Sequence, residues 1–150
     1  MTVRIASSPV YLDASALAKL YVEEPESDAL ERALIGRRDV VVSELAITEV
    51  TSALARRVRE RDLSSRDAGR VHRHILADLS GGEFQRIDLS PDLHRAAERL
   101  LLQVGGTAPL RASDALHIAL ATSIPARAFI TYDRRLREAA TGMATFEVFG

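Results

Sequence analysis

Four acidic residues stand at the ends of predicted strands or near the starts of predicted helices: Asp13, Glu49, Asp114 and Asp133. Asp13 follows the apolar run 10–12, and Asp133 follows the apolar run 128–131. Carboxylates gathered in one crevice repel one another unless some stay protonated or a cation binds. Oxygen ligands favour Mg²⁺ or Mn²⁺ over zinc. One or two such ions can orient a water and stabilise the leaving oxygen of a phosphodiester.

Each acid alone also has a simpler structural interpretation. Asp114 and Asp133 stand at predicted helix starts, where a carboxylate caps the helix and complements its dipole. Glu49, one to two turns into a predicted helix, could be solvated, and Glu44 is a rival acid that we interpret as structural. Asp13 is harder to explain as a surface charge because apolar residues precede it. The functional interpretation therefore depends on all four acids occurring together.

Four further residues lie close to these acids in sequence. Ser15 follows Asp13 by two positions and could contact a phosphate or the metal shell, or cap a helix. Thr131 precedes Asp133 by two and could hydrogen-bond a carboxylate or substrate. Arg134 adjoins Asp133 and is placed to touch a phosphate. His117, on an apolar helix, is interpreted as a buried, hydrogen-bonded residue in preference to a catalytic base.

The elements that must position these residues alternate along the chain. Strands are predicted at 9–13, 39–43, 84–89, 128–131 and 145–149. Helices are predicted at 14–22, from Pro25 to 35, and at 44–61, 64–79, 91–104, 114–121 and 133–140. Ser113 can cap the helix at 114–121. This alternation predicts an α/β fold, a three-layer α/β/α sandwich around a central parallel sheet of four to five strands. Strand ends and the helix starts that follow them share one edge of such a sheet, so Asp13, Asp114 and Asp133 should meet there.

Composition limits the classes of protein that remain. The 150 residues carry a net charge of −1, so any site for a polyanion must be local. The chain has no Cys, which excludes disulfides and zinc–thiolate sites. It has neither an apolar run long enough to span a membrane nor the apolar core of a signal peptide after a loose lead-in at 1–8. We expect one domain over 1–150, no membrane contact and a cytoplasmic location.

Four segments together resemble the acidic motifs of PIN-domain ribonucleases, and more narrowly VapC-type toxins of toxin–antitoxin pairs. They are Tyr11 to Leu17, Thr48-Glu49-Val50, Ser113 to Ala119 and Ile130 to Leu136. The resemblance implies a Mg²⁺-dependent endoribonuclease, with Mn²⁺ as a possible substitute, that hydrolyses RNA by metal-activated water. It implies that Asp13 and Asp114 bind the metal directly and that Glu49 and Asp133 complete the site. It further implies a homodimer silenced by a small VapB-like antitoxin.

Other interpretations remain at this point. A response-regulator or phosphatase-like fold also gathers acids around Mg²⁺, although Asp13-Ala14-Ser15 lacks a second acid. A dinucleotide enzyme would need a glycine-rich turn after the first strand, which is absent here. A binding module acting only through a partner is the non-enzymatic alternative. The arginines of 56–61 and the basic residues of 66–74 could guide an RNA backbone or form a solvated helix surface.

Overall fold

The computed structural model describes residues 4–143 and 145–150, so the first three residues of the predicted lead-in lie outside it. Its centre is a parallel sheet of five strands in the order β3-β2-β1-β4-β5. The strands are β1 (Val10–Leu12), β2 (Val40–Ser43), β3 (Gln85–Ile87), β4 (Ala128–Ile130) and β5 (Glu147–Phe149). The predicted parallel sheet is confirmed. β1 lies in its middle, with Leu12 opposite both Val42 and Ile130.

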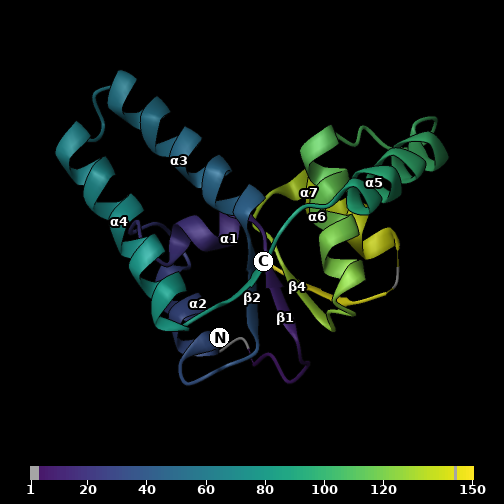
Figure 1. The fold of residues 1–150 in the computed structure, drawn as a ribbon, viewed down its shortest axis with the longest axis horizontal. Helices are drawn as coiled ribbons and strands as arrows, with labels where there is room; N and C mark the ends of the chain where they lie inside the picture. The colour runs from purple at the N-terminus through teal and green to yellow at the C-terminus, as the bar shows by residue number, and fades with distance from the viewer. Residues whose placement is uncertain (1–3, 144) are drawn as a thin grey trace.

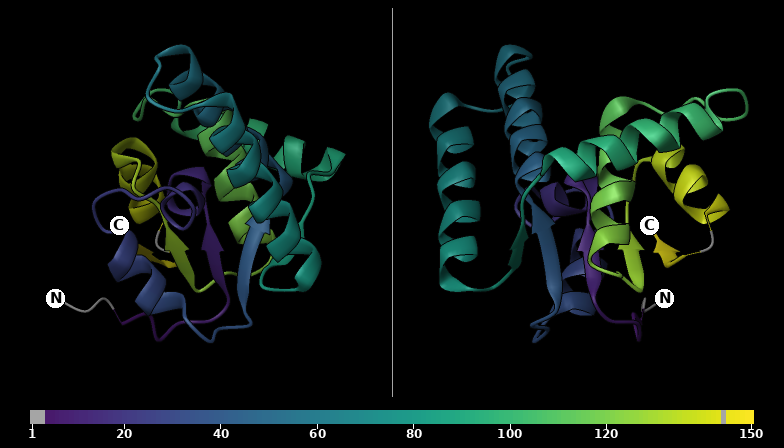
Figure 2. Two further views of the ribbon diagram at one scale, coloured as in Figure 1. Left: turned by 90° about the vertical axis from the view of Figure 1, so that its left-hand side faces the viewer. Right: turned by 45° about the vertical axis from the view of Figure 1, so that its right-hand side comes forward.

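Within the described residues, seven helices cover the two faces of this sheet, as the three-layer prediction requires (Figure 1). One face carries α1 (Ala14–Lys19), α2 (Ser27–Leu34), α3 (Glu44–Arg59) and α4 (Ser65–Gly81). The other carries α5 (Pro91–Val104), α6 (Ala112–Ser123) and α7 (Arg134–Gly142). The turned views show α3 and α4 as a hairpin that extends beyond the sheet on one side, with α5 and α6 on the other (Figure 2).

Alternate residues of the central strands belong to two separate apolar cores, because side chains alternate across a sheet. Leu12 and Ile130 pack beneath α1 to α4, whereas Tyr11 and Phe129 pack beneath α5 to α7. All of them are buried, which explains why β1 and β4 read as continuous apolar runs in the sequence. The burial on both faces holds the ends of β1 and β4 side by side.

Most helix starts have the side-chain caps that their sequences suggest. Ser64 caps α4 and Ser90 caps α5, each accepting a hydrogen bond from the backbone N–H three residues on. α3 is capped by Ser43, whose Oγ accepts from Ala46 N at 3.0 Å. Glu44 is the first residue of α3 and forms an exposed ion pair with Arg86 at 3.5 Å.

The start of α2 and the end of α1 differ from the prediction. α1 ends at Lys19 instead of residue 22, and α2 begins at Ser27 instead of Pro25. Glu26 has a left-handed backbone conformation, with φ of 69°, which a helix cannot contain. Lys19 Nζ donates to the carbonyl of Pro25 at 2.8 Å and ion-pairs with Glu26 at 3.1 Å. These tertiary contacts hold residues 24–26 as a loop against α1.

The start of α6 also differs, and Ser113 is not its cap. The helix begins at Ala112, and the Asp114 carboxylate accepts the Arg111 N–H at 3.0 Å. Asp114 therefore stabilises the start from within the first turn, which a sequence pattern does not distinguish from capping at Ser113. In the described part of the chain, none of the helices is both long enough and apolar enough to traverse a membrane.

Candidate active site

Asp13 lies at the carboxyl end of β1, where the sheet's central strand gives way to α1. Its side chain is 3 % exposed, and Oδ1 caps the helix by accepting from Ala16 N at 2.9 Å. Burial raises the pKa of this carboxyl, although hydrogen bonds from Thr131, Ala16 and Ser15 and the nearby His117 partly oppose the increase. A buried carboxylate with a raised pKa binds a cation readily, because the cation relieves the cost of burying its charge.

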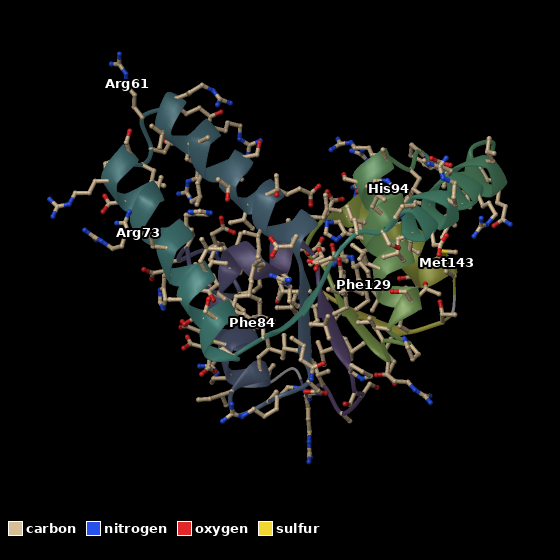
Figure 3. All side chains as sticks on the ribbon, viewed as in Figure 1. Arg61, Arg73, Phe84, His94, Phe129 and Met143 are labelled. Carbon is tan, nitrogen blue, oxygen red and sulfur yellow. The ribbon has the colours of Figure 1, made fainter. Side chains whose placement is uncertain are left out.

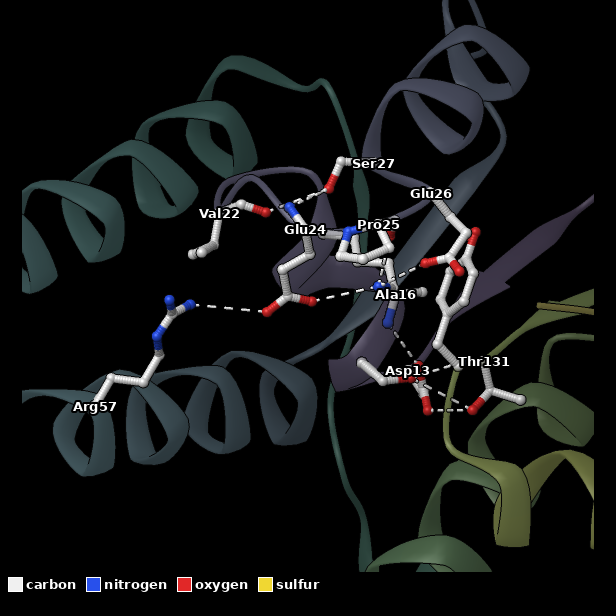
Figure 4. Close-up of polar contacts among 12 residues, drawn as sticks. Asp13, Ala16, Val22, Glu24, Pro25, Glu26, Ser27, Arg57 and Thr131 are labelled. Atoms are coloured by element: carbon white, nitrogen blue, oxygen red, sulfur yellow. Dashed lines mark hydrogen bonds and ion pairs between the residues drawn. The ribbon is translucent and has the colours of Figure 1, made fainter. Parts of the chain in front are cut away.

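Two neighbouring hydroxyl groups hold the two oxygens of the Asp13 carboxylate. Ser15 Oγ donates to Oδ1 at 2.7 Å. Thr131 Oγ1, at the end of β4, donates to Oδ2 at 2.6 Å (Figure 4). Each hydroxyl also accepts a backbone N–H of the segment that follows β4: Ser15 from Tyr132 at 2.8 Å, and Thr131 from Asp133 at 3.1 Å. Ser15 and Thr131 therefore join the ends of β1 and β4 and fix the Asp13 carboxylate. Capping of α1 belongs to Asp13 and not to Ser15.

Thr131→Val should therefore change both stability and pH dependence. Loss of a buried hydrogen bond to a charged group should lower the free energy of unfolding by about 2 kcal/mol. The Asp13 pKa should rise further, because the bond from Thr131 now lowers it. The Asp13 carboxyl should then ionise at higher pH, measured as the pH profile of the free energy of unfolding. Thr131→Ser keeps the hydroxyl and is the control. A Val variant with the parental profile would contradict this role.

Glu49 lies on α3 and bonds to a buried histidine of α6. Its Oε2 is 2.6 Å from His117 Nε2. Burial raises the pKa of the Glu49 carboxyl, but the hydrogen bond and charge of His117, with a further bond from Ser113, outweigh it. The pKa of Glu49 thus lies below its usual range, against the opposing charge of Asp133. Because the carboxyl is ionised, Nε2 of His117 carries the hydrogen and donates it.

The histidine is held in turn by a tyrosine from the middle of the sheet. His117 Nδ1 lies 2.6 Å from Tyr11 Oη, and Tyr11 Oη donates to Ser43 Oγ at 3.1 Å. Burial raises the pKa of Tyr11, and the charges of Asp13 and Glu49 raise it further, so the hydroxyl stays neutral. A continuous series of hydrogen bonds links the α3 cap Ser43, Tyr11, His117 and Glu49. His117 is buried and hydrogen-bonded, as the sequence interpretation held.

The other two acids lie at helix starts, and each uses one carboxylate oxygen there. Asp133 caps α7, with Oδ1 accepting from Arg135 N at 2.9 Å and from Leu136 N at 3.1 Å. Asp114 uses Oδ2 for the Arg111 N–H. Among residues 4–143 and 145–150, no hydrogen bond or ion pair engages Oδ1 of Asp114 or Oδ2 of Asp133. Their capping roles, which the sequence left open, do not exclude a second role at the remaining oxygen.

Arg134 stands beside Asp133 in a surface hollow of about 310 Å³, lined by Pro109, Asp133, Arg134, Arg135 and Glu138. Its side chain is 85 % exposed, and its one ion pair among residues 4–143 and 145–150 is with Glu138 at 3.7 Å. An exposed ion pair of this kind is weak, so Arg134 is available to an anionic ligand. A hollow of about 490 Å³ lies elsewhere, between α2 and α4, and none of the four acids lines it.

The four acids suit a hard cation in their chemistry but do not form a ready-made cage. They lie at the strand ends and helix starts described above, and only oxygen atoms are offered. Within the described ranges, no group of three or more acidic or histidine side chains is arranged to hold a metal ion. Mg²⁺ usually retains several waters and takes one or two carboxylates, so an open arrangement of this kind fits Mg²⁺ better than a closed structural site.

Comparison with known proteins agrees with this chemistry. A model of the PIN domain matches residues 10–142. Ribonuclease VapC46 of Mycobacterium tuberculosis is 42 % identical over 141 residues, which span 90 % of this chain and 94 % of that protein. The chain belongs to the VapC ribonucleases of the PIN-domain family. Ribonuclease VapC35 of the same species is 33 % identical over 140 residues, 90 % of this chain and 92 % of that protein. The family predicted from the acidic segments, that of ribonuclease toxins of toxin–antitoxin pairs, is confirmed.

Solved structures of VapC proteins share the fold. The crystal structure of M. tuberculosis VapC20, described as a sarcin–ricin loop cleaving toxin, has a TM-score of 0.71 at 17 % identity and covers 94 % of this chain and 99 % of that one. VapBC2 of Rickettsia felis, bound to promoter DNA, has a TM-score of 0.64 at 13 % identity, with coverage of 93 % and 96 %. The VapC arrangement of a parallel sheet between helical layers is thus the arrangement found here.

Sequence reasoning missed the part that Tyr11 and Ser43 play in the site. Tyr11 looked like an ordinary core residue of the first strand, and its ring does pack against Phe129. A tyrosine in a buried strand needs a partner for its hydroxyl, which is the one signal that could have indicated a polar neighbour. The sequence could not identify His117 as the partner of the Tyr11 hydroxyl, because that contact depends on how α6 packs against the sheet.

Proposed function

We propose that this VapC protein is a metal-dependent endoribonuclease that uses Asp13, Glu49, Asp114 and Asp133 to bind Mg²⁺, with Mn²⁺ as a possible substitute. The observation that supports this most is that side chains from other elements fix the carboxylates of two of the acids. Two hydroxyls hold Asp13 and a buried histidine holds Glu49. Supporting groups that fix carboxylates in this way are typical of metal sites. A structural acid at a helix start would not require them.

The chain's own residues define what the site would do. When bound, the divalent cation supplies positive charge for the scissile phosphate and lowers the pKa of an attacking water. Asp13 and Asp114 would hold the cation, while Glu49 and Asp133 would complete the site directly or through water. Glu49 has its Oε2 fixed by His117 and so presents its carboxylate in one orientation. Arg134 would contact the phosphate of the RNA, and Ser15 and Thr131 would keep Asp13 in place.

The partners follow from family membership and are part of the proposal. The substrate is RNA, and the inhibitor is a small VapB-like antitoxin, since structures that share the fold include the VapBC2 complex. We further propose that residues 1–150 act as one nuclease domain, that the protein is a homodimer, and that it acts in the cytoplasm.

RNA cleavage with defined products tests this function. The purified protein should cut RNA in Mg²⁺ or Mn²⁺ and stop when EDTA removes the metal. In-line attack by water needs no 2′-hydroxyl step, so the products should carry 5′-phosphate and 3′-hydroxyl ends. Mass spectrometry of the fragments identifies these ends. Ends with 2′,3′-cyclic phosphate, or equal cleavage in EDTA, would refute the mechanism. Release of phosphate from a phosphoprotein without RNA cleavage would favour the phosphatase-like alternative.

A further inference from the structure

The end of α3 and the start of α4 hold a concentration of positive charge that the chain as a whole lacks. Residues 56–73 contain seven arginines and three acids, although the complete chain has 20 basic and 21 acidic residues. The remainder of the protein is therefore acidic. Six of these arginines have exposed side chains, and we call them the hairpin arginines: Arg56, Arg59, Arg61, Arg66, Arg70 and Arg73.

The first hairpin arginines lead away from the candidate active site along α3, and the others lie in the turn that follows or on α4. α3 starts at the carboxyl edge of the sheet, carries Glu49 in its second turn, and then extends beyond the sheet (Figure 1). Arg56 lies two turns after Glu49 on the same face of the helix. Arg59 is ten residues from Glu49, about 15 Å along the axis. Figure 3 shows Arg61 at the tip of the hairpin and Arg73 on α4, both pointing away from the protein.

Folding accounts for only part of this charge. Arg56 and Arg70 have weak partners, Glu60 at 3.9 Å and Asp67 at 3.2 Å. The other four hairpin arginines make no ion pair within the part of the chain that the structure describes. Arg56 and Arg59 lie in the last turn of α3, where the helix dipole favours a cation. Arg66 stands in the first turn of α4, where the dipole disfavours a cation, and the last turn of α4 has no basic residue. The helix dipoles therefore account for the charge at the end of α3 but not for the charge at the start of α4.

We propose that the hairpin arginines bind phosphates of the RNA substrate on one side of the scissile bond, well outside the active site. This inference rests on the proposed function. Residues 56–73 contain no Phe, Tyr or Trp, so the contact would be with the backbone and would not read bases by stacking. The consequence is a dependence on substrate length. An RNA that reaches Arg59 and Arg61 gains affinity from them, and one that ends near the cut does not.

A triple variant, Arg59→Gln with Arg61→Gln and Arg66→Gln, tests the inference on two substrates. These side chains are exposed and unpaired in the described residues, so the fold should be retained. On an RNA of about 30 nucleotides, KM should rise about tenfold with kcat unchanged. The salt slope of log kcat/KM should shrink by about 2, as expected for three lost contacts to a single strand. On an oligonucleotide of about four nucleotides with the same cut site, the variant should match the parent.

The matched control removes three exposed arginines elsewhere: Arg32→Gln, Arg38→Gln and Arg127→Gln. It has the same net charge and should behave as the parent on both RNAs. The inference fails if the control loses as much activity on the long RNA as the hairpin variant does. It also fails if the hairpin variant is impaired equally on both substrates. A hairpin variant that cleaves long RNA normally but no longer binds an antitoxin would likewise contradict it. RNA binding is also measured by fluorescence anisotropy in an Asp13→Asn background. Failure of the proposed function would instead appear as absent cleavage by the parent.

Discussion

Asp13→Asn is expected to reduce RNA cleavage at least about 100-fold while making the protein more stable. The substitution removes the negative charge that would hold the cation but preserves size and shape. Asn is also a good helix cap, so α1 should still begin at residue 14. The measurement is single-turnover cleavage in saturating Mg²⁺, beside the thermal unfolding of both proteins in EDTA.

The gain in stability follows from the raised pKa of Asp13. An acid whose pKa is raised on folding costs stability as pH rises from its ordinary value, 3.8, through the raised value, and the full cost remains above that. At neutral pH the Asn variant escapes this cost. We expect a gain of about 1 kcal/mol, or an increase in Tm of about 2–4 °C for a domain of this size.

Asp92→Asn, at an exposed acid in the first turn of α5, is the matched control and should leave cleavage unchanged. Parental activity in Asp13→Asn would remove Asp13 from the site. A lower Tm for Asp13→Asn than for the parent in EDTA would show that the hydrogen bonds of the Asp13 carboxylate stabilise the folded protein more than its burial destabilises it.

His117→Ala is expected to lower cleavage by about 10–100-fold, the usual effect of removing a group that orients a metal-binding side chain. His117 is 2 % exposed and connects Glu49 to Tyr11. Without it, the Glu49 carboxylate can adopt several orientations. The change also leaves a cavity and the Tyr11 hydroxyl without its partner, so the free energy of unfolding should fall by about 2–4 kcal/mol.

The pH dependence of kcat/KM distinguishes a positioning role of His117 from a loss of folded protein. His117 lowers the Glu49 pKa, so its removal should raise that pKa and move the acid limb of kcat/KM to higher pH. A depressed Glu49 pKa contributes stability above its ordinary value of 4.5, and this contribution disappears as pH falls through the folded value. His117→Ala should therefore lose less stability on acidification than the parent.

Two variants act as controls for the histidine. Tyr11→Phe removes only the hydroxyl that meets Nδ1 and should cost less activity than His117→Ala. His94→Ala changes a histidine of α5 that lies on the surface, labelled in Figure 3, and should behave as the parent. An unchanged pH profile in His117→Ala, with activity lost only in proportion to the unfolded fraction, would mean that the histidine merely fills the core.

The fold was predictable because its strong patterns are local. Buried parallel strands read as apolar runs, and Ser64 and Ser90 mark helix starts by their position before a helical pattern. The predictions failed where a distant residue decides the backbone. Lys19 binds the loop at Pro25 and Glu26 and shifts the start of α2, and Asp114 displaces Ser113 as the residue that stabilises the start of α6.

The sequence by itself determined the order of the elements, the parallel sheet, the four acids and the family, because each depends on residue types over a few neighbouring positions. The tertiary structure alone decided how the acids are held. Ser15, left open between cap and ligand, bonds to Asp13 two positions away. It accepts the Tyr132 N–H only because β1 and β4 are neighbours. The His117–Glu49 bond joins residues 68 positions apart. Such pairings depend on how α6 and α3 pack on opposite faces of one sheet, and no local pattern encodes that geometry.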